Sequence, residues 1–511
     1  MPRTGLTTTA GNGFFPIEPP LPGVFSGRLL AGEGLPVFED NSEVSRWLMD
    51  RSLEDLGGVP ISGPSEHGDA IISDMMAAET IYALEREGGR DSSQWYTRSI
   101  HRMVAIASVL HPEIGDDRAA AEHPSGLFRN REEARTVLFA AMAITSQNIT
   151  VQDNMRYALE QYRAFLEDGA FKPRSYGANG GAIENNLARF NFILERAGGD
   201  LRRVRRLLSM KMKMKELQAA AKRYGIEVPA KEMADETVYG SMLFGPKVGN
   251  GFFQNLIGNH DPVTIDLWFM RLWGRYTGTL VRDEVREEAL DRLVKGLRRS
   301  MSGKRMRAMM EREGVAVEPS SVREMDAQQL LDYTRRLRLF WEKLRRKYVT
   351  GAISPAFHEK AGKAKGEPRP NSEVSELKAK LLWPGAAESI AGSLGYPVDS
   401  PRSAGLRRWI RSVCRQALAK LESHGYPMTA ADMQAVLWYP EKEIYARLSG
   451  RRAERLNMSY DEAMARIALQ EGASQEAVRE AVDSVPKSSI SKRRSPRQEE
   501  APPAPGMAAV A

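Results

Sequence analysis

The stretch GPKVGNGFFQNLIGNHDPVTIDLWFMR, residues 245–271, holds a glycine-flanked lysine, then an apolar run, then a single aspartate. Gly245 and Gly249 bracket Lys247, and the proline beside the lysine fixes one backbone angle, so we expect a tight turn before a helix. That helix should end at GNHDP, and VTID should be extended. Asp266 then stands at a favoured N-cap position, just before the apolar residues of a second helix.

Each charged residue of this stretch also has a purely structural explanation. Helix capping alone accounts for Asp266. Lys247 stands at a helix start, where free N–H groups face an anion, so a surface phosphate contact or simple solubility accounts for it. Their fixed order and their separation of nineteen residues are more informative than either residue alone.

Helical periodicity continues through most of the chain. Apolar residues recur every three or four positions, as in SEVSRWLMDRSLEDL (42–56) and NREEARTVLFAAMAIT (130–145). Strand signals are scarce, and we find no internal repeat of fixed period. The fold class is therefore expected to be mostly α.

Composition divides the chain into five expected segments. They are an extended Gly/Pro-rich N-terminal segment (1–41), a helical domain (42–350), a Gly/Pro/Lys-rich linker (351–372), a helical C-terminal unit (373–480) and a tail with the composition of disorder (481–511). In the C-terminal unit, Thr429 and Asp432 approximate a capping box. We expect the helix that follows to break or restart at Pro440.

Composition also excludes several classes of protein. The 511 residues are 42% hydrophobic and 27% charged, which is typical of a globular chain. Cys414 is the only cysteine, so a disulfide within the chain and a cysteine-ligated zinc or iron–sulfur site are excluded. Histidines do not cluster with carboxylates at metal-ligand spacing, and we expect no metal or other cofactor. With neither a signal-peptide pattern nor an 18-residue uncharged run, we expect no membrane association and a cytoplasmic location.

Positive charge is concentrated in two blocks. The formal net charge is +7, and residues 201–225 contain nine basic residues and one acidic residue. A second block, RRLRLFWEKLRRK (335–347), interleaves basic residues with Phe340 and Trp341. A solvated helix face explains either block alone. Together they favour a nucleic-acid partner, which basic side chains bind by neutralising phosphates.

The 245–271 stretch resembles the helix–hairpin–helix DNA glycosylase superfamily, which includes endonuclease III and the 8-oxoguanine DNA glycosylases. GPKVGNGFFQNL is similar to the second half of the family's DNA-gripping hairpin, and PVTIDLWFMR to its aspartate step. The spacing from Lys247 to Asp266 is that of the lysine-bearing 8-oxoguanine branch. LFAAMAITSQNITVQDNM (138–155) is similar to an earlier family segment. The match covers roughly 131–278, and Leu243 stands where the family has its first hairpin glycine.

The resemblance implies roles for individual residues. Asp266 is the expected catalytic carboxylate, which stabilises positive charge on the sugar as the glycosidic bond breaks. Lys247 is the expected amine nucleophile. Expected contacts to double-stranded DNA come from Gln147, Asn148, Gly245, Gly249, Asn250 and Arg271. Trp268 and Phe269 are candidates for a base pocket, although core packing is the better explanation of aromatic residues at helical spacing.

The implied activity is removal or processing of a modified or damaged base that is flipped out of DNA, with lyase activity as an extension. Two alternatives stay open. One is a phage enzyme of thymine hypermodification that has a glycosylase-like fold and processes a base without releasing it. The other is a catalytically silent DNA-binding or virion-associated protein. A phage-related origin places the protein in a bacterial or phage-infected cytoplasm, or in a virion.

Overall fold

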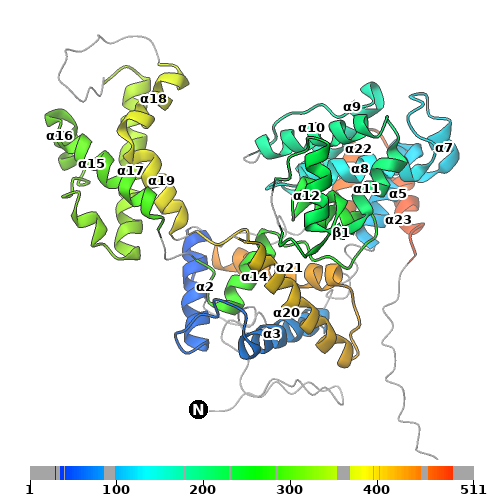
Figure 1. The fold of residues 1–511 in the computed structure, drawn as a ribbon, viewed down its shortest axis with the longest axis horizontal. Coiled ribbons are helices and arrows are strands. Elements are labelled where there is room, and N and C mark those ends of the chain that lie inside the picture. The colour runs from blue at the N-terminus through cyan, green and yellow to red at the C-terminus, as the bar shows by residue number, and fades with distance from the viewer. Residues whose placement is uncertain are drawn as a thin grey trace, which may run out of the picture.

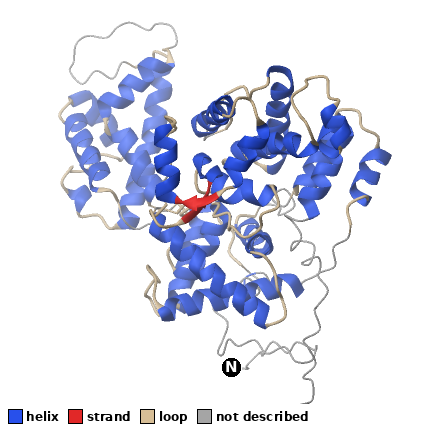
Figure 2. Cartoon of the chain, turned by 45° about the vertical axis from the view of Figure 1, so that its right-hand side comes forward, coloured by secondary structure: helices blue, strands red, loops and turns tan. Residues whose placement is uncertain are grey.

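Helices dominate the described part of the chain, as expected. The computed structural model describes residues 29, 35–39, 41–85, 98–177, 180–229, 232–281, 285–353, 369–394, 396–401, 403–450 and 458–486. Among these residues the only sheet has two strands, shown red in Figure 2. The helices gather into three lobes around separate apolar cores (Figure 1).

The first lobe lies at the upper right of Figure 1. Its elements are α5 (Ile100–Leu110), α6 (Pro112–Gly115), α7 (Asp117–Ala121), α8 (Arg131–Thr145), α9 (Val151–Asp168), α10 (Gly180–Arg196), α11 (Leu201–Ser209), β1 (Lys211–Lys213), α12 (Met214–Arg223), β2 (Thr237–Tyr239), η2 (Gly240–Phe244), η3 (Val248–Phe253), α13 (Gln254–Leu256), α22 (Tyr460–Gln470) and α23 (Gln475–Asp483). The side chains of Asn130 and Thr150 cap α8 and α9 by accepting backbone N–H groups. Strands β1 and β2 pair antiparallel, with Met212 opposite Val238.

The second lobe lies at the bottom of Figure 1 and combines helices from both ends of the chain. Its elements are α2 (Asn41–Asp55), α3 (Glu66–Glu85), α14 (Leu267–Thr277), α20 (Ala404–Ser423) and α21 (Ala430–Leu448). Trp273 of α14 meets Trp409 of α20 edge to face, with ring centroids 4.9 Å apart. Buried residues of α3, α14, α20 and α21 share one apolar core.

The third lobe lies at the upper left of Figure 1. Its elements are α15 (Glu287–Met301), α16 (Lys304–Arg312), η4 (Ser321–Arg323), α17 (Ala327–Val349), α18 (Asn371–Leu381) and α19 (Trp383–Ser393). Phe340 of α17 stacks on Trp383 of α19, with ring centroids 5.6 Å apart. Gly296 of α15 lets α19 approach closely, because a Cβ there would lie 2.5 Å from the Trp383 backbone nitrogen.

The packing differs from the domain boundaries expected from composition. The residues of 373–480 are shared among all three lobes: α18 and α19 join the third, α20 and α21 the second, and α22 and α23 the first. Most of the expected linker (351–372), N-terminal segment (1–41) and tail (481–511) lies outside the described residues. A linker composition indicates where a chain leaves a core, whereas the apolar faces of the later helices decide which core they join.

Helix α21 also differs from expectation, because it continues through Pro440 instead of breaking there. Thr429 caps it as predicted, accepting the Asp432 backbone N–H at 3.1 Å. Proline removes one helical hydrogen bond. Buried residues on both sides of it, Leu437 and Ile444, anchor the two halves of α21 in apolar cores. Tertiary packing therefore outweighs the local signal.

A buried charge cluster joins three helices of the second lobe. The Arg275 guanidinium of α14 donates to Glu79 of α3 at 2.7 and 2.8 Å, and to Glu441 of α21 at 2.9 Å. The Tyr276 hydroxyl donates to Glu79 at 2.7 Å. The side chains of Arg275, Glu79 and Glu441 are fully buried. Buried charges need such partners, so this Arg275 cluster fixes how α3, α14 and α21 dock.

Glu79→Gln is expected to lower the free energy of unfolding by about 3–5 kcal/mol, because it leaves the buried guanidinium with one carboxylate fewer. Glu122→Gln is the matched control, since its partner Arg118 is 83% exposed, and a loss of under about 1 kcal/mol is expected. Urea denaturation measures both. Equal stabilities of the two variants would contradict the role given to the cluster.

Candidate functional site

A cavity of about 600 Å³ lies between the first and second lobes. Its wall combines the turn after α8, one face of α10, the 244–250 turn, the extended segment before α14 and residues 399–411. Five of the residues predicted from sequence line it: Gln147, Asn148, Gly245, Lys247 and Asn250. Segments far apart in the sequence therefore meet at one hollow of a size typical of ligand sites.

The turn between η2 and η3 depends on glycine, as predicted. Gly245 has a φ of +102°, a conformation that L side chains rarely adopt. At Gly249 a Cβ would lie 1.6 Å from the carbonyl oxygen of Ser241. The Ser241 hydroxyl donates to the Gly249 carbonyl at 2.6 Å, and Asn250 accepts the Tyr239 N–H at 2.8 Å. Gly249 and Asn250 therefore serve the turn itself, and Asn250 in addition lines the cavity.

Lys247 lies half-buried on the cavity wall, at the start of η3. Burial lowers the pKa of its amine, and the negative charge of Asp266 acts in the opposite direction. Within the described residues the amine forms no hydrogen bond or ion pair with a side chain. It is thus a desolvated amine at the surface of a hollow, which is the state that nucleophilic lysines require.

Asp266 caps α14 as predicted, because its carboxylate accepts the Phe269 N–H at 2.8 Å. Its neighbours Ile265 and Leu267 line the cavity, whereas Asp266 itself is 6% exposed and lies behind the wall. Burial raises the pKa of the carboxyl, and the positive charge of Lys247 is the largest influence that lowers it. The two predicted catalytic residues are therefore electrostatic neighbours.

Helix α21 adds residues to this site that sequence reasoning missed. Gln434, Trp438 and Lys442 are spaced by four residues and so lie on one face of α21. The side-chain amide oxygen of Gln434 accepts the Thr264 N–H at 2.9 Å, and the Trp438 side chain interacts with the Asp266 carboxylate. The Lys442 amine sits 4.2 Å from the centroid of the Trp438 ring. This face of α21 therefore lies along the extended segment that ends at Asp266.

Lys442 is a second desolvated amine beside Asp266. It is 7% exposed. Burial lowers its pKa to about 8, although the charge of Asp266 raises it. Its positive charge in turn lowers the pKa of the Asp266 carboxyl. The four-residue repeat on α21 would have identified this face, but the helix was expected to stop at Pro440, two residues before the lysine.

The two predicted amides occupy the turn after α8. Asn148 is exposed and has a φ of +61°, in the left-handed region that asparagine tolerates better than most residues. Gln147 is partly exposed and donates to the Ile144 carbonyl at 3.2 Å. Both face the cavity across from the Lys247 turn. Their amide groups leave free hydrogen-bonding capacity at its edge.

Three other predicted residues lie elsewhere. Arg271 is 5% exposed: it pairs with Asp399 at 3.0 Å and its guanidinium lies 4.8 Å from the Trp268 ring centroid. A direct DNA contact by Arg271 is therefore not supported. Phe269 is 1% exposed in the apolar core, and Trp268 packs in another core without lining the cavity. Both aromatics follow the core-packing explanation.

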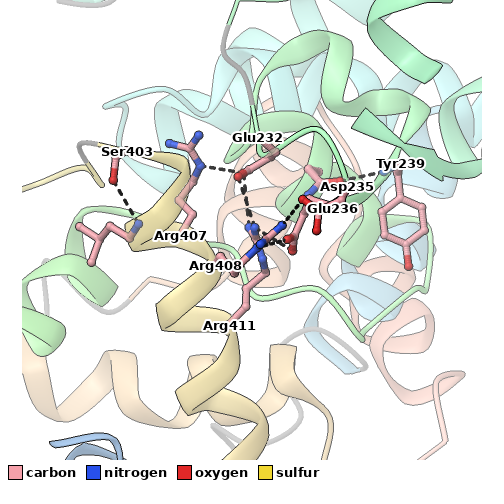
Figure 3. A network of polar contacts seen from close by, with 10 residues as sticks. Glu232, Asp235, Glu236, Tyr239, Ser403, Arg407, Arg408 and Arg411 are labelled. Atoms are coloured by element: carbon pink, nitrogen blue, oxygen red, sulfur yellow. Dashed lines mark hydrogen bonds and ion pairs between the residues drawn. The ribbon is translucent and has the colours of Figure 1, made fainter. Parts of the chain in front are cut away.

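An ion-pair network closes one side of the cavity and holds two lobes together (Figure 3). Glu232, in the segment between α12 and β2, accepts hydrogen bonds from Arg407 at 2.7 Å and from Arg411 at 3.3 Å. Arg408 pairs with Asp235 and Glu236 at 2.6 and 2.8 Å. Arg407 and Arg411 also line the cavity, so this α20 face is part of its wall.

The described residues contain no group of three or more His, Cys, Asp or Glu side chains that would hold a metal ion. No helix among them is both long enough and apolar enough to cross a membrane. Neither a protein-family model, nor a curated protein, nor a solved structure matches the chain.

Gly249→Ala is expected to lower the free energy of unfolding by about 1–3 kcal/mol or more, since the new Cβ collides with the Ser241 carbonyl. Gly181→Ala, in α10, is the control: its Cβ would meet nothing within 4 Å, and alanine favours helix by about 1 kcal/mol. Urea denaturation compares them. An unchanged free energy of unfolding in Gly249→Ala would show that Gly249 does not pack against the Ser241 carbonyl as described.

Proposed function

We propose that this protein processes a base that is flipped out of double-stranded DNA into the cavity between the first and second lobes. Lys247 is the proposed nucleophile, and Asp266 the charge that stabilises the transition state. The observation that carries the assignment is the convergence of Lys247, Gln147 and the residues flanking Asp266 on one cavity. The resemblance of the 131–278 region to helix–hairpin–helix DNA glycosylases supports the same chemistry.

The proposed reaction uses the amine of Lys247, after it has given up its proton, and the buried carboxylate of Asp266. The Lys247 nitrogen attacks C1′ of the flipped nucleotide, the C1′–N bond breaks, and its electron pair leaves with the base, which takes up a proton. The bound nitrogen then loses a proton, the C1′–O4′ bond breaks as O4′ takes up a proton, and a protonated Schiff base between Lys247 and C1′ results. Positive charge that develops on the sugar is stabilised by Asp266, whose influence is strong in a buried, low-dielectric setting.

The side-chain amides at the cavity edge are suited to stabilise the DNA duplex from which the base has been flipped. An extruded base leaves a gap in the stack, and filling that gap offsets part of the unstacking cost of a few kcal/mol. Gln147 and Asn148 present donors and acceptors next to the cavity, on a turn whose left-handed residue projects from the end of α8. Gln147 is assigned to the vacated space, and Asn148 to the partner base.

Lys247→Met is expected to abolish the covalent adduct that borohydride traps between the wild-type protein and DNA, because no other group is assigned to attack C1′. Lys215→Met is the control, as Lys215 is an exposed lysine of α12. The substrates are duplexes with uracil or 8-oxoguanine and DNA with modified phage bases, and mass analysis identifies released or altered bases. Asp266→Asn is expected to lower turnover at least 100-fold.

Each outcome decides between functions. An adduct retained in Lys247→Met, or full activity in Asp266→Asn, would overturn the assigned roles. An altered base without release would support the hypermodification alternative in place of glycosylase activity. Salt-dependent binding with no product from any of the DNAs would support a DNA-binding protein without catalysis.

Lys442→Met is expected to move the acidic limb of the pH–rate profile to higher pH. Lys442 carries a proton below its pKa of about 8, and its charge lowers the pKa of Asp266. Removing that charge raises the Asp266 pKa further, so the ionised carboxylate is lost at a higher pH. Lys442→Arg keeps the charge and should restore the wild-type limb. Coincident profiles of Lys442→Met and wild type would exclude this coupling.

A further inference from the structure

The junction of α15 and α16 concentrates positive charge outside the two blocks noted in the sequence. Residues 295–310, KGLRRSMSGKRMRAMM, contain six basic residues and no acidic one. All six are exposed, and we call them the basic corner: Lys295, Arg298, Arg299, Lys304, Arg305 and Arg307. They belong to α15, α16 and their junction in the third lobe (Figure 1), and none of them lines the cavity between the other two lobes.

Four of the six cations of the basic corner have no acidic partner in the part of the chain that the structure describes. Among described residues, no carboxylate lies within ion-pair distance of Lys295, Arg298, Lys304 or Arg305. Two of the three acidic residues of α15, Glu287 and Asp291, are engaged by Arg323. In the two blocks noted in the sequence, some of the basic residues are paired. There Arg205 pairs with Glu132 at 2.7 Å, and Lys343 with Glu313 at 2.7 Å.

The apolar core of the third lobe is formed without these cations. It takes apolar residues from the same helices, including Leu293, Leu297 and Met306. Arg298 and Arg299 lie in the last turn of α15, where cations favour the helix dipole. Lys304 and Arg305 lie in the first turn of α16, where the positive end of the dipole opposes them, and no side chain caps this helix. The helix dipole therefore accounts for Arg298 and Arg299 but not for Lys304 and Arg305.

A polyanion fits this surface better than a membrane does. Membrane-surface helices combine basic residues with apolar side chains that insert among lipids. None of the large exposed apolar side chains of the described residues lies between positions 285 and 316. Cations without apolar neighbours instead match a phosphate backbone, which basic side chains bind by releasing condensed counterions.

We propose that the basic corner binds the sugar–phosphate backbone of double-stranded DNA, at a distance from the nucleotide held in the cavity. The choice of DNA as the polyanion rests on the proposed function. The contacts are to phosphates, so they add affinity and orientation without reading sequence. The third lobe thereby becomes a second point of attachment on a long duplex.

Salt dependence of DNA binding tests this surface. Replacing Lys295, Arg298, Lys304 and Arg305 by Gln in the full chain should reduce the slope of log K against log salt by about 2–4, since each phosphate contact contributes about 0.9. The control carries the same change in net charge at exposed or half-buried, ion-paired positions of the first lobe: Arg156, Arg163, Lys172 and Arg174, each changed to Gln. Circular dichroism and thermal melting verify that both variants are folded.

An unchanged slope in the first variant, or an equal loss in the control, would overturn the DNA-binding role of the corner. Retained DNA binding combined with lost binding to phosphatidylserine vesicles would also overturn it, in favour of a membrane. The proposed catalysis is judged separately, because Asp266→Asn should lose turnover and keep the wild-type slope. A reduced slope in a protein that processes no base would uphold the corner and reject the enzyme.

Discussion

Burial of the Arg275 guanidinium between two carboxylates is the constraint on which the site depends. A buried cation must keep its partners, and those of Arg275 come from α3 and α21, more than a hundred residues away on either side of α14. The start of α14 carries Asp266, so the same cluster that fixes the helix also fixes its cap. Any movement of α21 away from α14 would separate charges that have no water to replace them.

Docking of α21 gives Asp266 surroundings that its own segment does not supply. The local sequence provides the backbone N–H of Phe269, which holds the carboxylate as a cap. The long-range packing provides Trp438 and Lys442, which interact with the same carboxylate. Two desolvated amines and one carboxylate therefore share a small volume. Their protonation states are coupled through Asp266, because its charge raises the pKa of both amines and the charges of both amines lower its own pKa.

The ion pairs at the cavity hold lobes together, whereas the exposed cations of the basic corner face solvent. Around Glu232, arginines of α20 are consumed by carboxylates of the first lobe, so they hold the lobes together and shape the wall. At the α15–α16 junction, Lys295, Arg298, Lys304 and Arg305 have no such partners among the described residues, and their field extends into solvent. A count of basic residues along the chain does not separate these cases, because pairing depends on acids that lie far away in sequence.

The sequence by itself determined the local features of this protein. Glycine chemistry predicted the turn around Lys247, and the capping preference of aspartate predicted the start of α14 at Asp266, because both depend on backbone geometry within a few residues. Helical periodicity predicted the mostly α character. The relation of Lys247 to Asp266 came from a spacing and a resemblance, and remains an assignment of function to be tested.

Only the tertiary structure decided which helices share a core and what each charge faces. It divided the 373–480 region among three lobes and carried α21 through Pro440, which brought Lys442 to the site. It also buried Arg271 between an aromatic ring and Asp399. The physical reason is that burial and ion pairing are sums over neighbours from the whole chain, and no local pattern specifies those neighbours.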